Sequence, residues 1–209
     1  MDMLDSPRTL RSPKAVALRR ALLTQPHIAP LASHVNALRS KHPDWEFQDF
    51  DPLDGGVEAD MLFLLEKPGP MTSPTGKKIG SGFISRNNDD PTAENVFNFM
   101  RTAGIERKRV VLWNVIPGWN ATIKYNAAEI RRGVEELRDL LPLLPNLHTV
   151  VLVGKPAQRA YSLLQTLRPD LRIHTSAHPS ARCFQFNPDQ WRAIPGQWEV
   201  AAQATRVAL

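Results

Sequence analysis

The sequence has a single cysteine and no long hydrophobic run. The lone Cys183 cannot form an internal disulfide, and it excludes a four-cysteine zinc or iron–sulfur site within one chain. No apolar run approaches the roughly 20 residues that a membrane-spanning helix needs. The basic N-terminus also lacks an apolar core followed by a small-residue cleavage site. We therefore expect no signal peptide and no membrane association, and a cytoplasmic location.

What the sequence does contain is typical of a globular protein. Its 209 residues suffice for one well-buried core, and 42% are hydrophobic while 22% are charged. The formal net charge of +5 is compatible with a polyanionic partner but does not require one.

Strand and helix patterns alternate from about residue 60 onward. Mostly apolar runs predict strands at 60–65, 109–113 and 149–153, and residues 171–175 are predicted as a fourth strand. Helical periodicity predicts helices at 92–103, 126–141, 156–166 and 188–207, the last broken near Pro195-Gly196. This alternation predicts an α/β fold: a three-layer α/β/α sandwich around a four-stranded parallel sheet.

The N-terminal stretch has a different pattern. Residues 1–13 carry two prolines and no periodicity, which predicts a loose arm, whereas 14–23 and 31–40 are spaced as helices. We expect residues 1–58 to form an arm and helices that pack on a core domain of residues 59–209, in one structural unit. The basic run Arg107-Lys108-Arg109 reads as a solvated turn before the second strand rather than as a DNA contact.

Polar residues follow each of the four predicted strands. The loops begin with Glu66-Lys67-Pro68-Gly69, Asn114, Gly154-Lys155-Pro156 and Ala177-His178-Pro179-Ser180. The carboxyl ends of parallel strands meet at one edge of a sheet, where ligands bind in open α/β folds. The sequence therefore predicts a site at this edge.

These segments, in this order, resemble those of the uracil-DNA glycosylase superfamily. Leu65-Glu66-Lys67-Pro68-Gly69 is similar to its first motif, and Gly82-Phe83-Ile84-Ser85 stands where the family has an aromatic residue that stacks on the extruded base. Leu112-Trp113-Asn114 matches the strand-end Asn, and Gly154-Lys155-Pro156-Ala157-Gln158 resembles a Gly-Ser-x-Ala-Gln turn. His178-Pro179-Ser180 reproduces the last motif. The resemblance spans roughly residues 60–187.

The resemblance implies hydrolysis of the N-glycosidic bond of uracil in DNA, with no metal and no cofactor. His178 would donate a hydrogen bond to O2 of the departing pyrimidine anion, and Asn114 would read the uracil amide edge. Phe83 would stack on the flipped base. Glu66 would orient water and stabilise the sugar cation.

The first motif departs from the family pattern at two substrate-binding positions. Lys67 replaces an acidic residue of one branch, so the acid stays open between Glu66, Asp89 and Asp90, or absent, and a Lys67 Schiff base is a further alternative. Gly69 replaces a Tyr that excludes the thymine methyl, so either Met71 fills the gap or 5-substituted uracils enter.

The same loops supply the predicted DNA contacts. Backbone and side-chain groups at serine-rich turns and helix starts can hold phosphates. The wedge that replaces the flipped base is expected just after His-Pro-Ser, with Arg182 and Phe184 as alternatives. The expected phosphate contacts are Ser81, Ser85, Thr92, Lys155 and Ser180.

Three functions remain open from the sequence. The first is a monofunctional uracil-DNA glycosylase of base-excision repair, acting as a monomer on single- or double-stranded DNA that contains uracil. The second is a non-catalytic reader of uracil or abasic DNA, motivated by the degenerate first motif and by Lys67. The third is a small-molecule nucleoside N-glycosidase.

Overall fold

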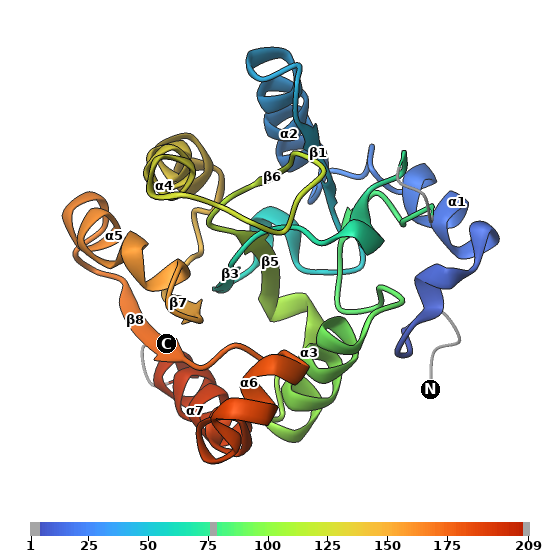
Figure 1. Cartoon of the computed structure of the whole chain (residues 1–209). Coiled ribbons are helices and arrows are strands. Elements are labelled where there is room, and N and C mark those ends of the chain that lie inside the picture. Colours follow the sequence, from blue (N-terminus) through green and yellow to red (C-terminus); the bar gives the residue numbers. More distant parts are fainter. Residues whose placement is uncertain (1–4, 76–78, 207–209) are drawn as a thin grey trace.

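A central parallel sheet organises the chain, as the computed structural model shows for residues 5–75 and 79–206. Its strands stand in the order β5-β3-β7-β8, and all neighbouring pairs are parallel (Figure 1). The predicted fold class is confirmed. The four strands are β3 (Met61–Leu65), β5 (Val110–Asn114), β7 (Thr149–Val153) and β8 (Arg172–Ser176).

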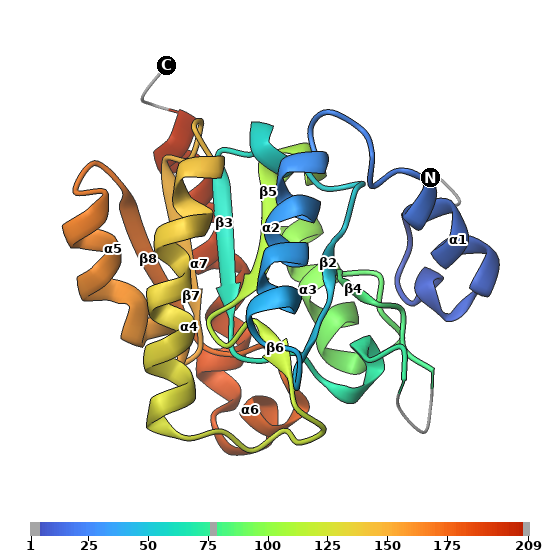
Figure 2. The ribbon, with the colours of Figure 1, turned by 90° about the horizontal axis from the view of Figure 1, so that it is seen from above.

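Helices cover both faces of the sheet. Helices α3 and α7 lie on one face, whereas α2, α4 and α5 lie on the other, and α1 lies to one side (Figures 1 and 2). The helices are α1 (Pro13–Ala21), α2 (Ala29–Lys41), α3 (Pro91–Thr102), α4 (Ala127–Leu140), α5 (Tyr161–Leu167), α6 (Ala181–Phe186) and α7 (Pro188–Arg206). Four two-residue strands, β1 (Glu46–Phe47), β2 (Asp49–Phe50), β4 (Phe83–Ile84) and β6 (Gly118–Trp119), form two small sheets.

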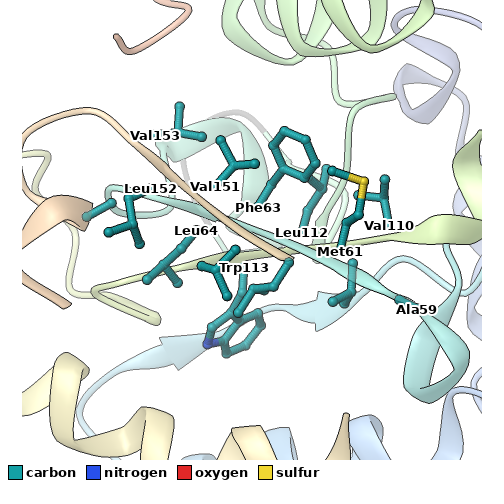
Figure 3. Close-up of a cluster of buried hydrophobic side chains, with 14 of the residues drawn as sticks. Ala59, Met61, Phe63, Leu64, Val110, Leu112, Trp113, Val151, Leu152 and Val153 are labelled. Atoms are coloured by element: carbon teal, nitrogen blue, oxygen red, sulfur yellow. The ribbon is translucent and has the colours of Figure 1, made fainter. Parts of the chain in front are cut away.

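The core follows from the pleat of the central strands, whose successive side chains point to opposite faces. Phe63 packs edge-on against Trp198 of α7 at 4.9 Å between ring centroids. On the other face Trp113 stacks on Phe50 at 4.0 Å. Figure 3 shows Phe63 and Trp113 on opposite sides of the strands. Because both faces are covered, the strands read as continuous apolar runs.

The expected loose arm spans residues 1–13, of which residues 1–4 lie outside the described residues, and the part from residue 5 onward is tied to the fold. The Asp5 carboxylate accepts hydrogen bonds from Arg86 at 2.7 Å and Asn87 at 3.1 Å, and it also pairs with Arg107. Arg107 reaches Asp54 at 2.8 Å, and its side chain is only 9% exposed, so the run 107–109 is not a solvated turn. A charge network buried this deeply requires partners on all sides, and the N-terminal segment supplies one of them.

The C-terminal helices also differ from the expectation. Helix α7 continues through Pro195 without a break. Burial of Ile194, Trp198 and Ala201 against the core holds it together despite the roughly 3 kcal/mol that an internal proline costs. The helix expected from residue 156 is instead a 3-10 turn over Ala157–Ala160 followed by α5. No helix in the described residues is long and apolar enough to cross a membrane.

Candidate functional site

A cavity of about 370 Å³ opens at the carboxyl ends of β3 and β5. The start of α3 and the loop after β8 complete its wall. Its lining includes much of the predicted site together with residues that the sequence did not single out: Leu65, Lys67, Pro68, Gly69, Pro70, Met71, Thr72, Ile84, Ser85, Arg86, Asn88, Asp90, Pro91, Thr92, Ala93, Val96, Leu112, Asn114 and His178.

Asn114 is the last residue of β5, in register with Leu65 at the end of β3. The backbone just beyond it is fixed, because the Val115 N–H donates to the Leu65 carbonyl at 2.8 Å. The Asn114 residue is 5% exposed, and its carboxamide has no hydrogen-bond partner among the described residues. A buried amide without an internal partner is available to a ligand as both donor and acceptor.

Three contacts position the loop that carries His178. The Gly154 N–H donates to the Ser176 carbonyl at 2.9 Å, and the Trp198 indole donates to the Ser176 hydroxyl at 3.0 Å. On the other side of the loop, the Asn95 amide of α3 donates to the Pro179 carbonyl at 2.8 Å. The imidazole is thus held from both flanks.

Close packing requires glycine opposite this imidazole. Gly154 has a φ of +87°, and a Cβ built on it would lie 3.2 Å from the His178 Cβ. Burial lowers the pKa of His178 from 6.5 to about 4, so the ring is neutral near pH 7. It has no hydrogen-bond partner among residues 5–75 and 79–206. A neutral imidazole can donate a hydrogen bond to a developing anion.

Asp90 is the carboxylate in the cavity wall. It caps α3, accepting the Ala93 N–H at 3.0 Å. Burial raises its pKa from the usual value, while the backbone N–H groups of Ala93 and Thr92 act in the opposite direction. The aspartate is therefore fixed by the helix start and lines the same cavity as Asn114 and His178.

Glu66 lies outside the cavity lining, at its rim. Its carboxylate accepts a hydrogen bond from the Tyr125 hydroxyl, and the charges of Arg182 and Lys67 stabilise it. Burial nevertheless raises its pKa above the ordinary value. The catalytic role expected of Glu66 stays a prediction, and it would require access to the base from this rim.

The family model of the uracil DNA glycosylase superfamily matches residues 55–194. The chain belongs to the uracil DNA glycosylase superfamily. No curated protein matches the sequence. Among solved structures the chain is similar to SMUG2 of Pedobacter heparinus, with a TM-score of 0.47 and 14% identity over 71% of this chain and 76% of that one. It is also similar to a mimivirus UNG in complex with UGI, with a TM-score of 0.39 and 16% identity over 87% and 75%. Neither likeness is strong enough to assign a residue role.

Two predicted site residues lie outside the cavity lining. Phe83 is buried with Leu10 and Ala15, and its neighbour Ile84 lines the cavity. The Ser81 hydroxyl is buried and bonded within the same turn. The stacking of Phe83 on a base and the phosphate contact of Ser81 stay predictions. A hydrophobic run of two residues does not reveal which of them faces the site.

The Lys67 ammonium is bonded within the fold. It donates to the Asn120 side chain at 2.7 Å and to the Lys124 carbonyl at 2.9 Å, and lies 3.4 Å from Glu129. The ammonium also lies 5.3 Å from the centre of the Trp45 ring. Lys67 thus anchors the loop before α4, and it is also part of the cavity lining. Its expected contact with substrate stays a prediction.

The other predicted substrate and phosphate residues divide between wall and rim. Gly69, Met71, Ser85 and Thr92 line the cavity, although the Ser85 hydroxyl is used by Asp51. No heavy atom lies within 4 Å of a Cβ built on Gly69, so nothing at this position excludes a larger base.

The remaining four residues lie outside the cavity lining. Lys155 and Arg182 are exposed, and Ser180 caps α6 by accepting the Cys183 N–H at 3.3 Å. Phe184 is 47% exposed and packs against Trp191, with ring centroids 5.0 Å apart. Their DNA contacts stay predictions.

The sequence analysis did not predict helix α6, although Ser180, three residues before Cys183, is a recognisable N-cap. No group of three His, Cys, Asp or Glu in the described residues could hold a metal.

Proposed function

We propose that the protein is a uracil-DNA glycosylase that hydrolyses the N-glycosidic bond of a flipped uracil without a metal. The observation that supports this most strongly is the pairing of Asn114 and His178 in one cavity, each without an internal hydrogen-bond partner in the described chain. A ligand that fills the cavity removes water from both groups, so a ligand that offers each a hydrogen bond is favoured over one that does not.

The two groups fit the two ends of the uracil amide edge. The Asn114 carboxamide donates to O4 and accepts from N3–H, whereas cytosine reverses both polarities. The neutral His178 imidazole donates to O2, where negative charge develops as the glycosidic bond breaks. Such a bond strengthens in the transition state, and removing a donor of this kind typically costs about 2.7–4 kcal/mol.

Asp90 is our preferred carboxylate for the sugar side of the reaction. It lines the cavity together with the two base-reading groups, whereas Glu66 does not. A carboxylate there orients the attacking water and stabilises positive charge on the sugar. The apolar side chains of Ile84, Leu112 and Val96 supply surface for the base in place of an aromatic stack.

A non-catalytic reader of uracil or abasic DNA is the alternative, motivated by the degenerate first motif and by Lys67. The structure gives the Lys67 ammonium a role in the fold, where it bonds to the loop before α4. Measurements of turnover therefore distinguish the three candidate functions. Tight binding of uracil-containing DNA without excision would favour a reader, and excision from free deoxyuridine alone would favour a nucleoside N-glycosidase.

The test uses labelled oligonucleotides that contain one uracil, with EDTA present and alkaline cleavage of the product. The wild type should yield the abasic site, and Asn114→Asp should lower excision roughly 100-fold, because a carboxylate then opposes O4. Asn146→Asp is the matched control, since it makes the same change at an exposed residue before β7, at the opposite end of the strands. Wild-type protein that releases no uracil from either DNA form would refute the proposal.

A further inference from the structure

A second hollow, of about 620 Å³, lies between the first turns of α4 and the turn after β7. Both segments follow strands that end at the site edge, so this hollow opens on the same side of the molecule as the base cavity. Figure 2 shows the start of α4 at the edge toward which β3 points. We call it the α4 groove, and the residues of its lining that matter here are Tyr125, Ile130, Arg131, Val134, Glu135 and Arg159.

The α4 groove is positively charged. Arg131 and Arg159 are exposed, and neither guanidinium group has a hydrogen-bond or ion-pair partner among the described residues. The carboxylate in its lining, Glu135, already pairs with Arg138 at 2.6 Å. Unpaired guanidinium groups above an apolar floor suit an anion that also carries flat apolar surface.

Tyr125 links the α4 groove to the rim of the base cavity. Its ring lines the groove and is 38% exposed, while its hydroxyl contacts Glu66. Glu66 stands between Leu65 and Lys67, which line the base cavity, and Lys67 also bonds to the carbonyl of Lys124 beside Tyr125. A polymer that inserts one unit into the cavity therefore has the α4 groove near its path.

We propose that the α4 groove binds the nucleic-acid strand beside the flipped nucleotide, with phosphates on Arg131 and Arg159 and a base against Tyr125. This inference rests on the proposed function, because it identifies the occupant from the adjoining cavity. Phosphates bind exposed arginines, and bases of any sequence stack on an exposed aromatic ring.

The test measures binding of a uracil-free single strand of about 16 nucleotides, the upper end of common site sizes, across a range of salt concentrations. Each phosphate contact to a single strand contributes about 0.7 to the slope of log K against log salt. The double variant Arg131→Ala/Arg159→Ala should therefore lower the slope by about 1.4, twice 0.7. The control Arg101→Ala/Arg172→Ala removes the same charge from exposed residues at the opposite end of the strands, and should leave the slope unchanged.

Variants of Tyr125 distinguish the contribution of base stacking from that of charge. Tyr125→Leu should weaken binding roughly 5- to 150-fold, the range expected for one lost base stack, whereas Tyr125→Phe keeps the ring and should retain binding. Equal loss in the groove and control double variants, or no loss in either, would overturn the proposal. A second combination of results would also overturn the proposal: polyglutamate at equal charge displaces the oligonucleotide, and Tyr125→Leu has no effect on binding. That combination would indicate a site for acidic partners in general.

The two proposals fail in distinguishable ways. Because the probe contains no uracil, the groove can be confirmed or refuted whether or not the protein excises uracil. If excision occurs, the Arg131→Ala/Arg159→Ala variant should raise KM for uracil-containing DNA and leave kcat unchanged. A change in kcat instead would indicate that the arginines act on the base cavity rather than on the strand.

Discussion

Substituting Gly154 by alanine tests whether the position of His178 controls the reaction. The glycine has a φ of +87°, where an L-residue costs roughly 1–2 kcal/mol. The added Cβ would lie 3.2 Å from the His178 Cβ and 3.4 Å from its Cδ2. The imidazole must therefore move by a few tenths of an ångström, although the Asn95–Pro179 bond holds the other flank of its loop.

Gly104 offers a matched control. It follows α3 with a φ of +63°, and no heavy atom lies within 4 Å of a Cβ built on it. Gly104→Ala therefore introduces the same kind of backbone strain with no neighbour to displace. At about 2–4 °C per kcal/mol for a chain of this size, both variants should lower Tm by about 2–8 °C.

Excision should separate the two variants. A displacement of about 1 Å at a reacting group costs about 100-fold in rate, so a few tenths should cost Gly154→Ala about tenfold in single-turnover rate. Gly104→Ala should retain the wild-type rate below its Tm. If the Gly154 variant loses stability but excises uracil as fast as the Gly104 variant, His178 does not act where we place it.

Three further predictions concern the charged groups around the cavity. Burial lowers the folded-state pKa of His178 to about 4, whereas the unfolded state titrates near 6.5. The urea concentration at the unfolding midpoint should therefore fall as the pH drops from 6.5 to 4, and this decrease should be smaller in His178→Gln. Asp90→Asn keeps the cap of α3 but removes the carboxylate, so it should lower the excision rate roughly 100-fold. Glu66→Gln should lower the rate less than about tenfold. If Glu66→Gln has the larger effect, Glu66 is the catalytic carboxylate. Borohydride should trap no covalent adduct between Lys67 and DNA, as it would if Lys67 formed a Schiff base. Lys67→Met should lower the free energy of unfolding by about 1–3 kcal/mol, measured with urea, because it leaves the Asn120 side chain without its donor.

The sequence predicted what depends on local pattern. A strand buried on both faces must be a continuous apolar run, so Met61–Leu65 and Thr149–Val153 were recognisable within a residue of their ends. Asn114 and His178 followed from the same reasoning, because a polar residue just past such a strand is placed at the site edge by topology alone.

What the sequence could not predict depends on contacts between distant segments. The direction of Phe83 is set by the pairing of β4 with β2, whose register puts Phe83 opposite Asp49. The burial of Arg107 depends on Asp5, 102 residues away. Lys67 appeared to be a substituted catalytic position, and only the folded loop at Lys124 shows that its ammonium serves the fold. Pattern and spacing carry no information about such partners.

The hydrogen bonds within the fold indicate which polar groups of the cavity can bond to a ligand. On the wall formed by residues 84–90, Ser85 donates to Asp51, the amide of Asn88 donates to the Phe83 carbonyl at 2.9 Å, and Arg86 donates to Asp5 at 2.7 Å. These bonds run to residues behind the wall and help to fix it, although the buried Nε of Arg86 has no partner in the described residues. Asn114 and His178 line the same cavity without a side-chain hydrogen-bond partner in the described chain, and their polar atoms are not sealed off from it. These two side chains can therefore bond to a ligand without first breaking a bond within the fold.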